Sequence, residues 1–159
     1  MTILVNMSHF RKFIAKNSSW VAFQALAICL LSQPLGLSAA ELLEIKAGGA
    51  IYRVEVASTS QQRRQGLMRR ASLDRNQGML LVYQKSADHR IWMRNVLIPL
   101  RVYWIDSDAR VIDMQRLEPC RQDPCPVYAA SGPSRYVLEL SDHEHPLEPG
   151  DIIDGLRDL

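Results

Sequence analysis

The chain has 159 residues, 19 of them basic and 17 acidic, which gives a formal net charge of +2. Three of the basic residues lie among the first 16, so residues 41–159 hold 16 basic and 17 acidic side chains, a net charge of −1. This balance excludes a domain that binds nucleic acid through a strongly basic surface.

The first 40 residues have the three parts of a secretory signal peptide. Three basic residues precede an apolar run of 12 residues, 20–31, and the small residues Ser38 and Ala40 follow it. The run is too short to span a bilayer, which takes about 20 residues. We therefore predict cleavage after Ala40 and export to the periplasm, with translation beginning at Met1 or Met7. An uncleaved membrane anchor is the alternative.

Residues 41–159 form one predicted domain, long enough to bury about two thirds of its unfolded surface. Short apolar or alternating segments predict strands. In chain order these segments are residues 42–47, 50–57, 78–83, 91–94, 100–106, 110–115, 135–140 and 151–154. A helix is predicted over residues 60–68, capped by Ser58 or Thr59 and ending near Gly66. The pattern predicts a mainly β, α+β fold, either a compact antiparallel β-barrel or a sandwich-like single domain.

Cys120 and Cys125 are the two cysteines that remain after the predicted cleavage, and four residues separate them. Paired cysteines in exported proteins usually form disulfides. Redox-active pairs have two intervening residues instead. We therefore predict a structural disulfide, with a metal or redox site as the alternative.

Four motifs stand in order along residues 55–151. They are Gly66, Leu67, Met68 and Arg70; then Gly78 and Met79; then Trp92, Met93, Asn95, Pro99 and Leu100; and last the segment YVLEL, residues 136–140. In these motifs the chain resembles the family called domain of unknown function 192 (DUF192). The resemblance implies a compact β-rich domain and no established activity. The family usually has an acidic residue after the Pro-Leu pair. Arg101 stands there instead, so a site that needs that carboxylate is not expected.

The segment IWMRNVLIPLRVYWID, residues 91–106, places polar residues between two apolar strands. One interpretation is structural, with Trp92 filling the core and Asn95 shaping a bend. The other is a ligand site, with Arg94 and Asn95 at the rim of an apolar pocket walled by Trp92 and Tyr103. Arg94 is then the better candidate for ligand contact, and Asn95 for a structural role. The candidate ligand-binding residues are Trp92, Met93, Arg94, Asn95 and Tyr103.

Two other clusters offer further chemistry. His143 and His145 can face one way in an extended segment and bind zinc or copper, with His89 as a further ligand; a solvated loop is the alternative interpretation. Four arginines surround the predicted helix and form either a solvated face or a site for an anionic surface. These four are Arg63, Arg64, Arg69 and Arg70.

The sequence offers no nucleophile with a base, no acid pair and no glycine-rich phosphate loop at a useful spacing. We therefore expect an exported, non-catalytic binding module for a small ligand or a cell-envelope partner. It is expected to be monomeric, to need no cofactor, to bind no nucleic acid and to meet the membrane only through its N-terminal segment. The alternative is a metal-binding protein or a metal-assisted enzyme that uses His143 and His145.

Overall fold

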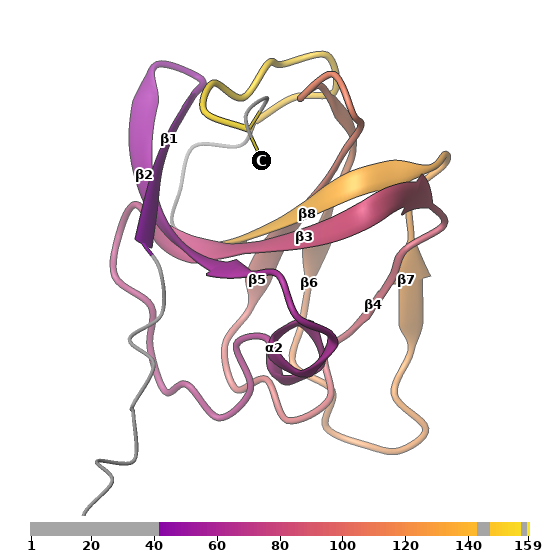
Figure 1. The fold of residues 1–159 in the computed structure, drawn as a ribbon. Coiled ribbons are helices and arrows are strands. Elements are labelled where there is room, and N and C mark those ends of the chain that lie inside the picture. The colour runs from indigo at the N-terminus through magenta and orange to yellow at the C-terminus, as the bar shows by residue number, and fades with distance from the viewer. Residues whose placement is uncertain (1–41, 143–146, 157–158) are drawn as a thin grey trace, which may run out of the picture. The chain divides into compact units, whose positions relative to one another are not determined.

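The computed structural model divides the chain into two units, residues 1–39 and 40–159. It describes residues 42–142, 147–156 and 159, all within the second unit. These residues form strands and one short helix (Figure 1). The elements are β1 (Leu42–Ala47), β2 (Ala50–Ala57), α2 (Ser60–Gln65), β3 (Gln77–Ala87), β4 (Arg90–Trp92), β5 (Leu100–Ile105), β6 (Val111–Leu117), β7 (Val127–Ala129) and β8 (Ser134–Ser141). The predicted mainly β fold with one short helix is confirmed.

Six strands form one sheet in the order β1-β2-β3-β8-β5-β6, and β4 pairs with β7 in a separate ribbon. Four of the five neighbouring pairs in the large sheet are antiparallel, but β2 and β3 are parallel. The chain between β2 and β3 includes α2, and such a long connection allows two consecutive strands to run in the same direction. The prediction of an entirely antiparallel structure is therefore wrong at this pair.

The large sheet is not a closed barrel, because its edge strands β1 and β6 do not pair with each other. Residues 151–154 were predicted to form a strand, but they make only isolated bridges. Lys46 bridges to Asp154, and Arg110 bridges to Ile152. The C-terminal segment thus contacts β1 at one edge of the open sheet and the start of β6 at the other. The barrel alternative is therefore wrong.

Both faces of the sheet are buried. Tyr136, Leu138 and Leu140 of β8 belong to one apolar cluster, whereas Val137 belongs to another. Since neighbouring residues of a strand point to opposite faces, the two clusters lie on opposite sides of the sheet. In Figure 1, α2, β4 and β7 lie on one side of β3 and β8, and the C-terminal segment lies on the other. Burial on both sides explains why residues 136–140 of β8 are apolar on both faces, with Glu139 as the exception.

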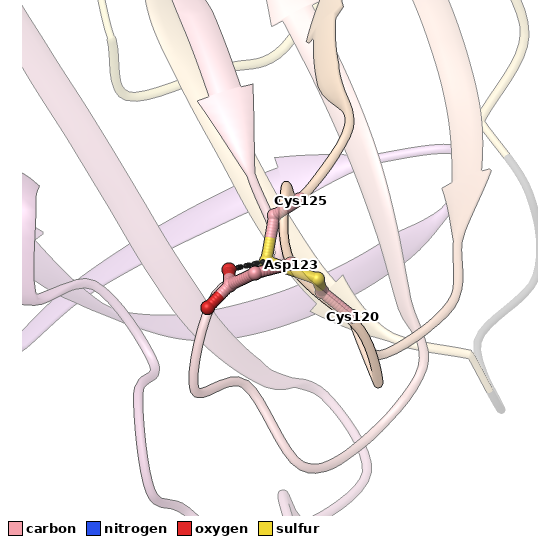
Figure 2. Close-up of side chains that lie close together, drawn as sticks. All are labelled: Cys120, Asp123 and Cys125. Carbon is pink, nitrogen blue, oxygen red and sulfur yellow. Dashed lines mark hydrogen bonds between the residues drawn. A yellow bond between two sulfur atoms is a disulfide. The ribbon is translucent and has the colours of Figure 1, made fainter.

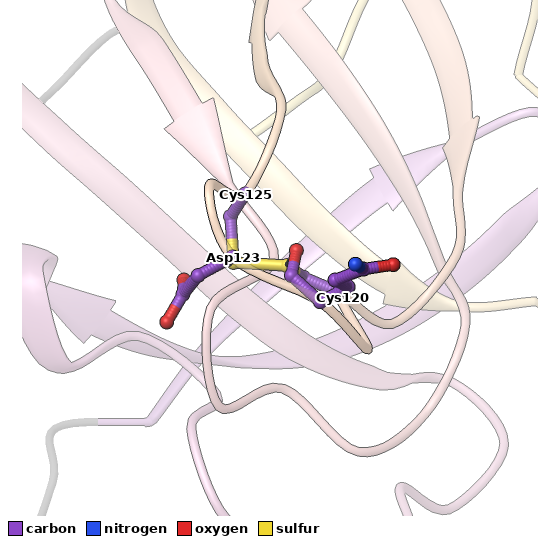
Figure 3. Close-up of a disulfide and its surroundings, with 4 residues drawn as sticks. Cys120, Asp123 and Cys125 are labelled. Atoms are coloured by element: carbon purple, nitrogen blue, oxygen red, sulfur yellow. Dashed lines mark hydrogen bonds between the residues drawn. A yellow bond between two sulfur atoms is a disulfide. The ribbon is translucent and has the colours of Figure 1, made fainter.

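The loop between β6 and β7 is closed by a disulfide. Cys120 and Cys125 are bonded, with their Cα atoms 5.6 Å apart (Figure 3), so the predicted disulfide is confirmed. The backbone N–H of Cys120 donates to the carbonyl oxygen of Met93 at 3.4 Å. The bridged loop therefore supports the turn that follows β4. Among the residues that the structure describes, no helix is long and apolar enough to cross a bilayer.

Candidate ligand-binding cleft

Two adjoining cavities lie between α2, the turn after it and the segment that contains β4. Their volumes are about 170 and 540 Å³, and both are lined by Arg64, Gln65, Met68 and Trp92. Because they share these walls, we treat them as one concavity and call it the arginine cleft. The sheet contributes three further lining residues, Leu81, Tyr83 and Glu139.

The sequence positions the helical wall of the cleft through its capping residues. The hydroxyl of Thr59 accepts a hydrogen bond from the Gln62 N–H at 3.2 Å, and the Gln62 side chain accepts one from the Thr59 N–H at 2.9 Å. This capping box fixes the start of the helix. The helix ends at Gln65, next to the predicted Gly66, which turns the chain with a φ of 47°; residues 67 and 68 of the predicted range lie outside it.

The turn after the helix brings Gly66 against the sheet. A Cβ added to Gly66 would lie only 3.7 Å from Oε2 of Glu139. Leu67, the next residue, is buried in the apolar cluster on this side of the sheet. The first family motif thus approaches a carboxylate of the last one, although the two are far apart in the sequence.

The second wall is the segment from β4 to Asn95. Ile91 and Met93 point into the core, and Trp92 between them points outward with 41% of its surface exposed. The expectation that Trp92 fills the core is therefore wrong. The indole N–H of Trp104 donates to the carbonyl oxygen of His89 at 3.0 Å, which holds the start of β4 against the sheet.

Asn95 occupies a left-handed backbone conformation with a φ of 58°, and its carbonyl oxygen accepts a hydrogen bond from the Arg69 N–H at 2.8 Å. Asn adopts this conformation more readily than most residues. The turn at Asn95 therefore joins the two walls of the cleft through the backbone. Arg94 stands beside it, with its guanidinium 5.8 Å from the centre of the Trp92 ring.

Tyr103 does not line the arginine cleft. It is fully buried in the cluster on the opposite side of the sheet, and its hydroxyl accepts a hydrogen bond from the Leu147 N–H at 3.4 Å. The prediction that Tyr103 forms a wall of the pocket is wrong. Neighbouring residues of β5 face opposite sides of the sheet, and the cleft lies on the side of Trp104. The structure thus brings together Trp92, Arg94 and Asn95 around the cleft, with Met93 buried beneath them.

Five arginines line the cleft, and they differ in what they already bind. They are Arg63, Arg64, Arg69, Arg90 and Arg94. The guanidinium of Arg63 lies 4.7 Å from the centre of the Tyr83 ring and donates to the Val82 carbonyl oxygen at 2.9 Å. Within the described residues, the side chains of Arg64, Arg69 and Arg90 form no hydrogen bond or ion pair, and of these Arg64 and Arg90 line the smaller cavity. These two cations are free to meet a ligand.

Arg70 of the family motif has a different role. Its guanidinium makes two hydrogen bonds to the carboxylate of Glu55, at 2.5 and 2.6 Å. The pKa of Arg70 is raised, first by this hydrogen bonding to Glu55 and further by the charges of Glu55 and Glu139. Arg70 therefore ties the turn to β2, and its charge is largely neutralised there.

Glu139 is the one acidic residue among the described lining residues of the cleft. Its side chain is almost fully buried, with 6% of the residue exposed. Burial raises its pKa to about 7, and the nearby charge of Arg70 opposes this shift. In the part of the chain that the structure describes, no cation lies within ion-pairing distance of its carboxylate. Near neutral pH the group can therefore donate or accept a hydrogen bond.

The candidate site residues predicted from the sequence did not include Glu139, Arg90 or Leu67. A signal for Glu139 was present, because it is the only charged residue within the apolar segment YVLEL of β8. Arg101, which stands where the family usually has an acidic residue, does not line the cleft. Arg101 pairs with Asp142 at 3.3 Å, beyond the cleft at the end of β8, so the loss of an acidic residue at that position leaves the cleft unchanged.

The predicted metal ligands do not form a described site. His143 and His145 lie outside the described residues. His89 stacks on Tyr83 with 3.4 Å between ring centres, and this contact holds it in place. The metal-ligating side chains that do come together in the described part are Cys120, Asp123 and Cys125 (Figure 2). Since the two sulfur atoms are bonded to each other, they are not available as thiolate ligands.

Two solved structures share this fold. One is a protein of unknown function from Novosphingobium aromaticivorans DSM 12444, with a TM-score of 0.67 and 27% identity over 75% of this chain and 89% of that one. The other, from Sinorhizobium meliloti 1021, is described as a candidate transcription regulator. It has a TM-score of 0.68 and 25% identity over 75% of this chain and 97% of that one. Among curated proteins, none matches the chain.

The sequence profile of the DUF192 family, described as "Uncharacterized ACR", matches residues 42–154. This range contains all four motifs that carry the resemblance, together with every strand of the fold. The match covers well over half of the chain. The protein therefore belongs to the DUF192 family, as predicted from its motifs.

Proposed function

We propose that this domain is a non-catalytic binding module that holds a small ligand in the arginine cleft through an anionic group and an apolar part. The observation that carries the proposal is the pair of uncommitted cations, Arg64 and Arg90, beside the exposed ring of Trp92. Arginine binds phosphate and carboxylate groups well because its planar guanidinium donates two parallel hydrogen bonds.

The walls of the cleft supply the complementary apolar surface. Leu67, Leu81, Ile91 and Val96 are buried apolar residues that line the smaller cavity, and Trp92 lines both cavities. Ligand pockets typically combine apolar walls with a few placed polar groups. This composition favours a ligand that is part apolar and part anionic over a bare inorganic anion.

Phenyl phosphate is the probe for this proposal, because it joins a dianion to one aromatic ring. We expect the purified domain, residues 41–159, to bind it with a change in tryptophan fluorescence, since Trp92 lines the cleft. Replacing Arg64 and Arg90 together by Ala is expected to weaken binding about tenfold or more, the scale of a lost charge-assisted hydrogen bond. Isothermal titration calorimetry measures both affinities.

Arg53→Ala is the matched control, because Arg53 is exposed on β2, pairs with Glu44 and does not line the cleft. Its affinity for phenyl phosphate is expected to equal that of the unchanged protein. Equal binding by the Arg64/Arg90 variant, or no binding by the unchanged protein, would contradict the proposal.

The same proposal places the module in the periplasm, on the basis of the N-terminal sequence alone. We expect the protein isolated from its own cells to begin at Glu41, because small residues at Ser38 and Ala40 follow a short apolar run. Intact mass spectrometry of the exported fraction measures this directly. Recovery of the full-length chain in the membrane fraction would instead support the uncleaved anchor.

A further inference from the structure

The side chain of Glu139 forms no hydrogen bond and no ion pair with any other described residue. It lies on β8 between Met79 of β3 and Val102 of β5, in the middle of the large sheet. Its side chain points to the side of the cleft, among the apolar residues that cover α2's side of the sheet. A buried, unpaired carboxylate destabilises a fold by several kcal/mol when it is ionised. A residue that is this unfavourable for folding is a candidate for a binding role.

The surroundings leave the carboxylate open to a ligand. Gly66 has no side chain, and this absence keeps the space next to Oε2 of Glu139 free. The smaller cavity, about 170 Å³ in volume, reaches Glu139 and shares Arg64 and Trp92 as walls with the larger one. A ligand whose anionic end meets the arginines can therefore extend a short arm of a few non-hydrogen atoms to Glu139.

The charges around Glu139 decide which group that arm should carry. Arg70 is bound to Glu55, Arg63 is bound to Tyr83 and to backbone carbonyls, and neither forms an ion pair with Glu139. Tyr83, which also faces the cavity, has a pKa raised by its burial and stays neutral. Among the described residues, Glu139 is thus the one carboxylate in a cleft whose other charged lining residues are arginines.

We propose that the natural ligand is a zwitterion, with an anionic group on Arg64 and Arg90 and an ammonium group on Glu139. This inference rests on the proposed function and specifies the class of its ligand. The bound ammonium compensates the buried carboxylate, and the apolar walls around it strengthen the pair by excluding water.

Two probes of equal size separate the ammonium from the anion. O-phosphoethanolamine and propyl phosphate have the same phosphate and the same number of non-hydrogen atoms, but one ends in an ammonium and the other in a methyl group. At pH 8 we expect the unchanged protein to bind O-phosphoethanolamine at least tenfold more tightly. Glu139→Gln is expected to abolish this preference while it keeps its affinity for propyl phosphate.

Glu44→Gln is the control, since Glu44 is an exposed carboxylate on β1 that pairs with Arg53. It should keep the preference for the ammonium probe. If propyl phosphate binds in a manner that depends on Arg64 and Arg90 but O-phosphoethanolamine binds no better, the zwitterion is overturned and the binding module stands. The zwitterion is likewise overturned if Glu139→Gln keeps the preference. If neither phosphate binds, the zwitterion is overturned as well, and the phenyl phosphate titration alone decides whether the binding module stands.

Discussion

Glu139→Gln is expected to raise the free energy of unfolding by about 3 kcal/mol at pH 8.5, because one pKa unit corresponds to about 1.4 kcal/mol. Burial raises the pKa of Glu139 from 4.5 to about 7, so the folded protein holds a proton that the unfolded chain has already released. The stability that this group allows is fully present below pH 4.5 and is lost as the pH rises through about 7. Glutamine has nearly the same shape and never ionises.

Urea denaturation at pH 4.5 and at pH 8.5 measures the free energy of unfolding, and thermal denaturation at the same two pH values measures the midpoint temperature. The variant should gain little at pH 4.5, whereas at pH 8.5 its thermal midpoint should rise on the order of 10 °C for a domain of this size. Glu44→Gln, on the exposed side of β1, should show no gain that depends on pH. An equal gain at both values, or a loss at pH 8.5, would show that Glu139 is not a buried, unpaired carboxylate.

The gain in stability is expected to accompany a loss of the preference for the ammonium probe. Functional residues are often unfavourable for the free protein and become favourable only when the ligand is present. The same substitution, Glu139→Gln, should therefore stabilise the domain and abolish its preference for the ammonium probe. A residue that served only the fold would show neither effect.

Local patterns in the sequence were sufficient to locate most of the strands. The segment AIYRVEVA alternates between apolar and polar residues and became β2, and the helix begins after Thr59, one of the two predicted caps. The three-residue strand β7 was missed because it follows a proline-rich loop and is too short to show a period. The parallel pairing of β2 with β3 was also missed, since pairing depends on residues far apart in the chain.

The position of Tyr103 shows why the site was predicted only in part. Tyr103 and Trp104 are neighbours on β5, and both are fully buried on opposite sides of the sheet. Alternation along a strand separates two faces but does not say which face carries the cleft when both are apolar. Trp92, Arg94 and Asn95 lie around the same cavity because they are close together in the sequence, at the end of β4 and in the turn after it.

The surroundings of Glu139 could not be predicted from the sequence. A lone glutamate in an apolar strand indicates a buried carboxylate, but the surroundings of that carboxylate depend on the turn that brings Gly66 next to it. The sequence also does not show which of the arginines around the helix are bound by other residues. Arg63 and Arg70 are bound to groups on the sheet, whereas Arg64 is free, and the spacing along the helix does not distinguish them.

Gly78→Ala is expected to lower the free energy of unfolding by about 3 kcal/mol or more, or to prevent folding, because an overpacked core must shift to admit the added atom. Gly78 belongs to the second family motif and pairs with Leu140 between β3 and β8. A Cβ at this position would lie 2.3 Å from the carbonyl oxygen of Glu139 and 2.6 Å from Cδ2 of Leu140. The backbone of β8 would have to move, and Glu139 would move with it.

Gly132→Ala tests the same chemical change where there is space for it. An added Cβ at Gly132 meets no atom within 4 Å, so this variant should match the unchanged protein or gain up to about 1 kcal/mol through a less flexible unfolded chain. Urea denaturation of both variants measures the difference. If Gly78→Ala folded with a stability close to that of Gly132→Ala, β3 and β8 would have room for a methyl group, and the close packing that positions Glu139 in the cleft would be refuted.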